Sequence, residues 1–353
     1  MDIQILYKNA VTLLKQMIAT PSFSKEEDQT ASLLCKFIGE NKIAHSRSGN
    51  NVWALNQYFN KNIPTILLNS HHDTVKPNPA YTRNPFMAEE EDGKLFGLGS
   101  NDAGGCVVSL LAAFVYFYNR QDLKYNLAIA LTAEEEISGR NGIESILSEL
   151  PEIDFAIVGE PTLTEMAIAE KGLMVLDCVA HGIAGHAARE EGDNAIYKAI
   201  KDIEWFRTFR FSKVSETLGP VKMNVTMIKA GEQHNVVPAT CNFTVDVRVT
   251  DAYKNEEIVE LIQQHIDSEI IPRSLRLRSS SINKDHPIVK AAVKLDKKLY
   301  GSPTTSDQAL IPAPSVKVGP GDSARSHSAD EFIYLREIQK GIETYIGLLE
   351  EVM

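Results

Sequence analysis

Residues 65–73 read TILLNSHHD, a short apolar run that ends in two histidines and an aspartate. The apolar part, residues 65–68, has the length of a strand that is buried on both faces. Residues 127–131 (LAIAL) and 155–158 (FAIV) have the same character, and the apolar segment 106–118 is long enough for a core helix. Strands that alternate with helices predict an α/β fold with a mostly parallel sheet.

Each of these three predicted strands is followed by histidines or carboxylates. His71 and Asp73 follow the first strand, three glutamates at 134–136 follow the second, and Glu160 follows the third. Ligands of open α/β sheets bind beyond the carboxyl ends of the strands. Three separate segments are therefore expected to deliver imidazole and carboxylate groups to one edge of the sheet.

The length of 353 residues favours about two domains. Lys and Arg number 36 against 47 Asp and Glu, a net charge of −11 that argues against nucleic acid and anionic membranes as partners. Segment 106–118 is shorter than the roughly 17–25 residues that span a bilayer. Because the first residues lack a secretory pattern and the four cysteines are far apart, we expect a cytoplasmic protein with free thiols.

A second domain is predicted between residues 167 and 280. Strands are expected at 173–179, 221–228, 239–249 and 274–280, and helices at 195–206 and near 258–266. The order βαββαβ is typical of a ferredoxin-like α+β sandwich. The α/β signals resume after about residue 283, so residues 1–166 and 281–353 are predicted to form one discontinuous domain that carries the insertion. Near the start of the chain, Ser24-Lys25-Glu26-Glu27 is a capping box that predicts a helix toward Gly39.

The strongest chemical pattern is a dispersed set of hard ligands, comprising His71, Asp73, Asp102, Glu135, Glu136, Glu160 and His327. Imidazole and carboxylate groups together suit Zn²⁺, Co²⁺ or Mn²⁺. The residues alone leave other interpretations open, since a lone histidine is often an ordinary polar residue and three glutamates often form a charged loop. Asp102, which precedes Gly104 and Gly105, could simply cap the following helix.

Seven short segments resemble, in order, the motifs of the M20 metallopeptidase family. They are SHHDTV at 70–75, LFGLGSND at 95–102, TAEEE at 132–136, GEPT at 159–162, GHAA at 185–188, NVVP at 235–238, and GPG at 319–321 followed by His327. The resemblance covers nearly the whole chain. It implies a zinc-aminopeptidase-like catalytic domain with two zinc ions and an inserted lid domain that forms a homodimer.

The resemblance also implies a role for each metal ligand. His71 and Glu160 would bind one zinc ion, Glu136 and His327 would bind the other, and Asp102 would bridge them. Cobalt or manganese could substitute for zinc.

Three more residues would act in catalysis. Asp73 would accept the second N–H of His71 and so fix its tautomer. Glu135 would be the general acid and base, although the alternative register, Glu134 and Glu135, stays open. His186 on the lid would donate to the oxyanion, and His72 would be a bystander.

The remaining roles concern the substrate. By resemblance, the α-carboxylate would be bound by Arg248 as a bidentate fork, with help from Asn235 and the backbone at Gly319 and Gly321. Three further residues could line the pocket for the leaving amine: Ser306, Asp307 and Asp322.

The expected function is zinc-dependent hydrolysis of the amide bond of an N-acyl amino acid. N-acetylornithine, a substrate of arginine biosynthesis, is the first choice, and N-acetylcitrulline, N-succinylornithine and N-acetyllysine are alternatives. Succinyl-diaminopimelate desuccinylase, an M20 dipeptidase and a catalytically inactive metal-binding protein also stay open. The intact Glu135 argues against the last of these. The dimer is expected to form at the open edge of the inserted sheet, so that His186 reaches the partner's zinc site.

Overall fold

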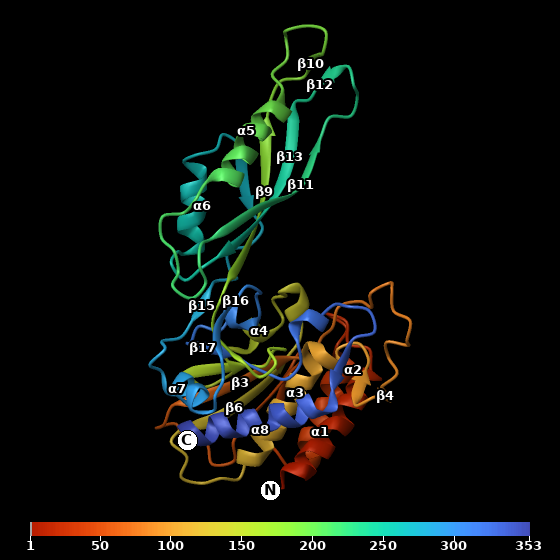
Figure 1. The fold of residues 1–353 in the computed structure, drawn as a ribbon, viewed down its shortest axis with the longest axis vertical. Coiled ribbons are helices and arrows are strands. Elements are labelled where there is room, and N and C mark those ends of the chain that lie inside the picture. The colour runs from red at the N-terminus through yellow and green to blue at the C-terminus, as the bar shows by residue number, and fades with distance from the viewer. Residues whose placement is uncertain (1) are drawn as a thin grey trace. The chain divides into compact units, whose positions relative to one another are not determined.

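The computed structural model describes residues 2–353, which form two compact units (Figure 1). The first unit takes in the chain up to Ile168, Ser281–Tyr300 and Ser306–Met353. The second unit comprises Ala169–Ser280 and Gly301–Thr305 and interrupts the first. The predicted fold class, an α/β sheet with a separate small antiparallel sheet, is confirmed.

The first unit is built on a nine-stranded mixed sheet with the strand order β1-β2-β6-β3-β7-β17-β8-β15, where β16 also pairs with β8. The central strands β6, β3, β7 and β17 run parallel, whereas the pairs β1–β2, β2–β6 and β17–β8 are antiparallel. The bounds are β1 His45–Ser48, β2 Asn51–Leu55, β3 Thr65–His71, β6 Asn126–Thr132, β7 Phe155–Val158, β8 Met166–Glu170, β15 Ser280–Ser281, β16 Leu299–Ser302 and β17 Ser315–Lys317.

Both faces of this sheet are covered, which explains why its strands read as continuous apolar runs. Ile66 and Leu68 of β3 pack into one core cluster, whereas Leu67 between them packs into another on the opposite face. The first cluster takes its helical residues from α1 (Ile3–Ile18), α2 (Asp28–Glu40), α3 (Gly105–Phe117), α7 (Pro287–Lys294) and α8 (Leu335–Val352). The short α4 (Ile143–Ile146) covers the other face.

Helix α3 is the predicted core helix. With the preceding turn, residues 100–117 are long and apolar enough to cross a membrane by length and composition, but 83% of this segment is buried inside the fold. It packs against α1 and α8 (Figure 1). Burial inside the fold therefore accounts for its apolarity. A three-stranded sheet, β18-β5-β4, lies in the same unit, with bounds β4 Glu89–Glu91, β5 Lys94–Phe96 and β18 Phe332–Tyr334.

The predicted capping box is wrong. Helix α2 begins at Asp28, and its N-cap Glu27 makes no side-chain capping bond. The Ser24 hydroxyl instead donates to the carboxylate of Asp73 at 2.7 Å, and the Glu27 carboxylate accepts the N–H of Lys25. Distant partners also engage Glu27, whose carboxylate accepts the side-chain amide of Asn50 and the N–H of Glu134. Both side chains thus serve tertiary contacts and not the helix terminus.

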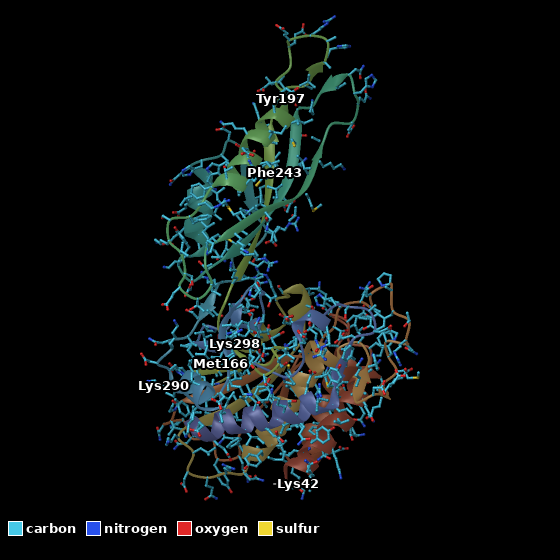
Figure 2. The ribbon with its side chains drawn as sticks, viewed as in Figure 1. Lys42, Met166, Tyr197, Phe243, Lys290 and Lys298 are labelled. Carbon is cyan, nitrogen blue, oxygen red and sulfur yellow. The ribbon has the colours of Figure 1, made fainter. Side chains whose placement is uncertain are left out.

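The second unit is a four-stranded antiparallel sheet with the order β11-β13-β9-β14, two helices and a small β10–β12 pair. The bounds are β9 Gly172–His181, β10 Gly185–His186, α5 Ala195–Thr208, β11 Lys222–Ala230, β12 Val236–Val237, β13 Thr240–Val249, α6 Asn255–Gln263 and β14 Glu269–Pro272. Figure 2 shows two extremes of burial in it. Phe243 lies inside the core, and Tyr197 projects from α5 with 72% of its surface exposed.

The predicted last strand of this unit, residues 274–280, is wrong. The pairing strand is β14, which joins β9 at residues 176–179. Leu275 and Leu277 alternate as in a strand, but their carbonyls accept the side-chain amide of Asn255. Ser280 and Ser281 belong to β15 on the other sheet.

Candidate metal centre

The carboxyl ends of three adjacent parallel strands carry the predicted ligands. His71 is the last residue of β3, and Glu135 and Glu136 begin a 3₁₀ turn just after β6. Glu160 comes two residues after β7. Because β3 pairs in parallel with both β6 and β7, the three segments meet at one edge, as predicted from the sequence.

His71 is the centre of a first group of donors. Its side chain is 1% exposed, and its Nε2 atom lies 3.3 Å from Oδ1 of Asp102. The same nitrogen lies 3.7 Å from Oε1 of Glu160 and 3.9 Å from Oε2 of Glu135. One ligand atom each of His71, Glu135 and Glu160 falls within 4.8 Å of the others, and the same holds for His71, Asp102 and Glu136.

His327 supplies a second imidazole on the other side of Asp102. Its Nε2 atom lies 2.9 Å from Oε2 of Glu136 and 3.7 Å from Oδ2 of Asp102. Asp102 thus directs one carboxylate oxygen to His71 and the other to His327. This is the position that a bridging carboxylate between two ions would take.

Asp73 supports the site in more ways than the sequence indicates. Its carboxylate accepts the N–H of Glu135 at 3.0 Å, the N–H of Glu136 at 3.2 Å and the Ser24 hydroxyl. Nδ1 of His71 is closer to the main-chain oxygen of Asp73 (3.0 Å) than to its carboxylate (3.4 Å). Asp73 therefore orients the imidazole and holds the glutamate turn at the same time.

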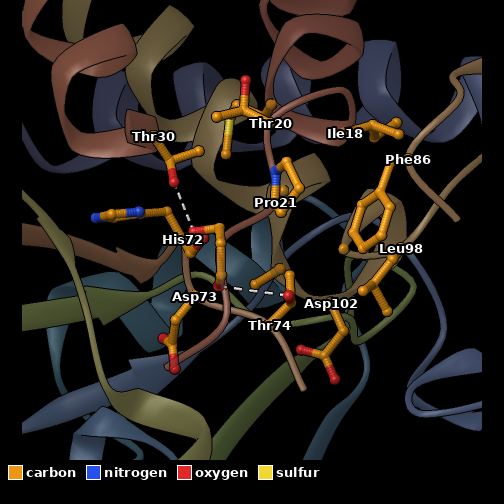
Figure 3. A pocket seen from close by; sticks show the side chains of 15 residues that line it. Ile18, Thr20, Pro21, Thr30, His72, Asp73, Thr74, Phe86, Leu98 and Asp102 are labelled. Carbon is orange, nitrogen blue, oxygen red and sulfur yellow. Dashed lines mark hydrogen bonds between the residues drawn. The ribbon is translucent and has the colours of Figure 1, made fainter. Parts of the chain in front are cut away.

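Figure 3 shows that Asp73 and Asp102 direct their carboxylates to the same side, away from Thr20 and Pro21. Thr20 and Pro21, together with Asp73 and Asp102, line a cavity of about 20 Å³. That volume has room for about one water molecule, so it is no substrate pocket. His72 is buried, and its Nε2 lies 2.9 Å from the carbonyl oxygen of Asn50, consistent with a bystander.

Glu134 points to different partners from its two neighbours. It has a positive φ of 56°, and its carboxylate accepts both the N–H and the side-chain amide of Asn141. Its own N–H donates to Glu27. Of the three glutamates, Glu135 and Glu136 are therefore the two that face the imidazoles.

The charges of the site are out of balance without a cation. Burial alone would lower the pKa of His71, but the surrounding carboxylates, Glu135 first, raise it well above its usual value. Burial raises the pKa of Glu135 well above its usual range, and Glu160 adds to this. A hydrogen bond to Glu136 raises the pKa of His327 to about 9.

The donor set consequently fits divalent metal ions. Four carboxylates, those of Asp102, Glu135, Glu136 and Glu160, converge on the imidazoles of His71 and His327. The two imidazoles together can carry at most two positive charges. Crowding carboxylates in a partly buried place is costly unless a cation neutralises them. Nitrogen and oxygen donors of this kind suit Zn²⁺, Co²⁺ and Mn²⁺.

Several predicted substrate residues have structural partners. The N–H of Gly319 donates to Oγ1 of Thr162, and a Cβ at Gly319 would lie 2.6 Å from Sγ of Cys106. Gly321 has a φ of 90°, which favours glycine. Gly319 is thus explained by close packing beside Cys106 and Glu160, and Gly321 by its backbone conformation.

The expected pocket residues Ser306, Asp307 and Asp322 also have structural partners. Ser306 and Asp322 cap short 3₁₀ turns. Asp307 is 3% exposed and accepts the Thr132 hydroxyl at 2.7 Å, and burial raises its pKa to about 6.

The second unit holds the remaining predicted residues. His186 ends β10, is exposed, and accepts the N–H of Ala188 on its Nδ1. The carbonyl of Asn235 accepts the N–H of Ala187, so the two predicted motifs lie together. Arg248 makes a bidentate pair with Asp246 at 2.9 and 3.1 Å.

Two cations near Arg248 were not predicted from the sequence. Lys222 on β11 lies opposite Arg248 in the sheet register. Burial lowers the pKa of Lys171, and the charges of Lys222 and Arg248 lower it further. Lys171, which is 6% exposed, has its ammonium group 3.1 Å from the carbonyl oxygen of Pro220. No spacing pattern links these residues, because the sheet alone brings them together.

The carboxyl ends of β3, β6 and β7 meet the segments that carry Asp102 and His327, and together they gather two imidazoles and four carboxylates. This donor set fits a metal-dependent hydrolase of the α/β class. The model of "Peptidase family M20/M25/M40" matches residues 67–351. The chain belongs to this family, as its motifs predicted.

Relatives and solved structures can be aligned with nearly the whole chain. A succinyl-diaminopimelate desuccinylase of Rickettsia bellii (strain RML369-C) is 26% identical, with 97% of this chain and 96% of the relative covered. Among solved structures, aminopeptidase PepT from Bacillus cereus ATCC 10987 has a TM-score of 0.77 at 18% identity, covering 98% of both chains. The Bacillus subtilis YXEP protein, a dinuclear metal-binding peptidase from the M20 family, has a TM-score of 0.76 at 15% identity, covering 99% of this chain and 98% of its own.

Proposed function

We propose that the protein is a two-zinc amidohydrolase that removes the acyl group from an N-acyl amino acid. The observation that carries this proposal is the placement of Asp102 between the imidazoles of His71 and His327, with the partly buried carboxylate of Glu135 beside them. A catalytically inactive metal-binding protein would have no need to keep Glu135 there.

In this proposal, His71 and Glu160 hold one zinc ion, Glu136 and His327 hold the other, and Asp102 is shared. When bound, the two ions supply Lewis acidity and lower the pKa of water to near neutrality. Cobalt or manganese could occupy the same donors.

Glu135 then serves as the general base and acid. It accepts a proton from the attacking water and returns that proton to the nitrogen of the leaving amine. Asp73 orients the Glu135 backbone through the 3.0 Å hydrogen bond to its N–H. The Glu135–Glu136 register is supported by the engagement of Glu134 with Asn141.

The second unit supplies substrate contacts. His186 donates to the oxyanion, and Arg248 with Asn235 binds the α-carboxylate of the substrate. The Asp246 carboxylate occupies the Nε–H and one Nη2–H of Arg248, which leaves three of the five guanidinium N–H groups for the substrate carboxylate.

A homodimer through the second unit would complete the site. Strand β11 is an edge strand with Met227 and Ile228 more than half exposed, and Tyr197 and Ile200 project from α5. An open strand edge beside apolar side chains is suited to a symmetric partner. The proposed location of this dimer is the cytoplasm, where the four cysteines stay reduced.

N-acetylornithine, the substrate expected from the sequence, and N-succinyl-diaminopimelate are the two proposed substrates. Two observations favour the second: the desuccinylase relatives, and the gathering of Lys171 and Lys222 beside Arg248, which suits a substrate with several carboxylates. Amine release by the zinc-loaded protein from both compounds, N-acetylcitrulline, N-succinylornithine and a dipeptide panel would decide between them. Turnover of dipeptides alone would contradict the deacylase proposal.

A further inference from the structure

Glu331 has a buried carboxylate that binds the backbone of the Asp102 loop. The residue is 2% exposed. Its Oε1 atom accepts the N–H of Asn101 at 2.8 Å and the N–H of Asp102 at 2.9 Å. Its Oε2 atom accepts the N–H of Gly99 at 3.0 Å, and its carbonyl accepts the N–H of Gly97. One residue therefore holds four backbone N–H groups of residues 97–102.

The same residue lies close in sequence to the second imidazole. Glu331 follows His327 by four positions and immediately precedes β18, which pairs with β5 through Phe332 and Phe96. Strand β5 leads directly into the loop that carries Asp102. The two chain segments that present Asp102 and His327 are thus joined twice, by the strand pair and by the Glu331 carboxylate.

Only a carboxylate can make this set of contacts. Each of its oxygens accepts from backbone donors, and all three donors point at it. In a glutamine, one oxygen becomes an NH₂ group, which would face a backbone N–H with no acceptor between them. A buried donor that loses its acceptor in this way is costly.

We propose that Glu331 is a positioning residue of the metal centre. It fixes the backbone of Asp102 relative to His327, so that Oδ1 of Asp102 stays directed to His71 and Oδ2 to His327. This inference rests on the proposed function in one respect, since it takes these three side chains as ligands.

The test compares E331Q with the neighbouring control D330N in the full-length protein. Asp330 also accepts two backbone N–H groups, those of Thr82 and Arg83 at 2.9 Å, but it does not touch the Asp102 loop. Affinity for Zn²⁺ is measured by chelator competition on metal-free protein, and the Co²⁺-loaded proteins are compared by visible absorption. E331Q is expected to weaken binding of at least one ion by about 10–100-fold and to change the Co²⁺ spectrum, while D330N keeps both within about twofold.

Melting of the metal-free proteins separates positioning from folding. If E331Q only lowers the melting temperature and binds both ions with wild-type affinity and spectrum, Glu331 is merely structural and the proposal fails. Equal weakening by D330N would overturn it too. If E331Q does not fold, E331D takes its place, since it keeps the charge but is one methylene shorter, and wild-type affinity in E331D refutes the proposal. Wild-type protein that binds no pair of ions would overturn the metal centre itself, a result distinct from the others.

Discussion

The roles of Glu134 and Glu135 can be separated by two identical substitutions one residue apart. Glu135→Gln keeps the shape of the side chain but removes the proton acceptor. General-base catalysis contributes about 10²–10⁴-fold, which corresponds to roughly 2.7–5.4 kcal/mol at 1.36 kcal/mol per factor of ten. We therefore expect turnover to fall by that factor.

The stability of the metal-free protein should depend on Glu134 and not on Glu135. Burial and the Glu160 charge raise the pKa of Glu135, so the ionised form is disfavoured in the metal-free protein. A neutral glutamine removes that repulsion, and metal-free Glu135→Gln should melt no lower than wild type. The Glu134 carboxylate accepts the side-chain amide of Asn141 at 2.8 Å and its backbone N–H at 3.3 Å. In Glu134→Gln, an NH₂ group faces one of these two donors, and that hydrogen bond is lost. The cost of such an unsatisfied buried group is about 1–3 kcal/mol.

Turnover is measured as amine release from the best N-acyl substrate. Metal content is measured by elemental analysis, and melting curves are recorded on the same preparations. Glu135→Gln should lose turnover and retain two ions. Glu134→Gln should lose several degrees of melting temperature, on the order of 2–4 °C per kcal/mol, with turnover within about tenfold of wild type. If Glu134→Gln abolishes turnover with metals retained while Glu135→Gln loses a metal, the register is off by one residue and the reasoning is refuted.

Three further predictions concern the metals, the substrate and the dimer. Asp102→Ala removes the shared carboxylate and should lose both ions or nearly so by elemental analysis, whereas full activity of metal-free wild-type protein would contradict the zinc mechanism. Esterifying the α-carboxylate of the best N-acyl substrate should remove most activity, because the ester offers Arg248 no charged carboxylate to bind, and equal rates on ester and acid would count against this role. Mixing inactive His186→Ala and Glu135→Gln chains should restore activity, because one site of each mixed dimer is then complete. Chains that exchange subunits, shown by mass, yet stay inactive would disprove a contribution of His186 in trans.

The α/β class and the edge of the sheet that carries the ligands follow from the sequence. Runs such as 127–131 are apolar at every position because both faces of the sheet are covered, and that pattern is local and legible. Parallel pairing then places whatever follows each strand at the same edge, which made His71, Glu135 and Glu160 foreseeable neighbours.

Tertiary contacts decided what the local pattern left open. The alternating leucines at 275 and 277 resemble a strand, yet β14 pairs with that edge of β9, and the carbonyls of both leucines accept the side-chain amide of Asn255 instead. Ser24 was predicted to cap a helix, but Asp73 competes successfully for its hydroxyl because it is an ionised, buried acceptor.

The same distinction holds within the site. The sequence identifies three successive glutamates, but only the left-handed turn at Glu134 sends its side chain to Asn141 and leaves Glu135 and Glu136 facing the imidazoles. Glu331 lies 229 positions from Asp102, and no periodicity connects them. Residue types and strand ends can be predicted from the local sequence, whereas hydrogen bonds between distant segments form only once the sheet has brought those segments together.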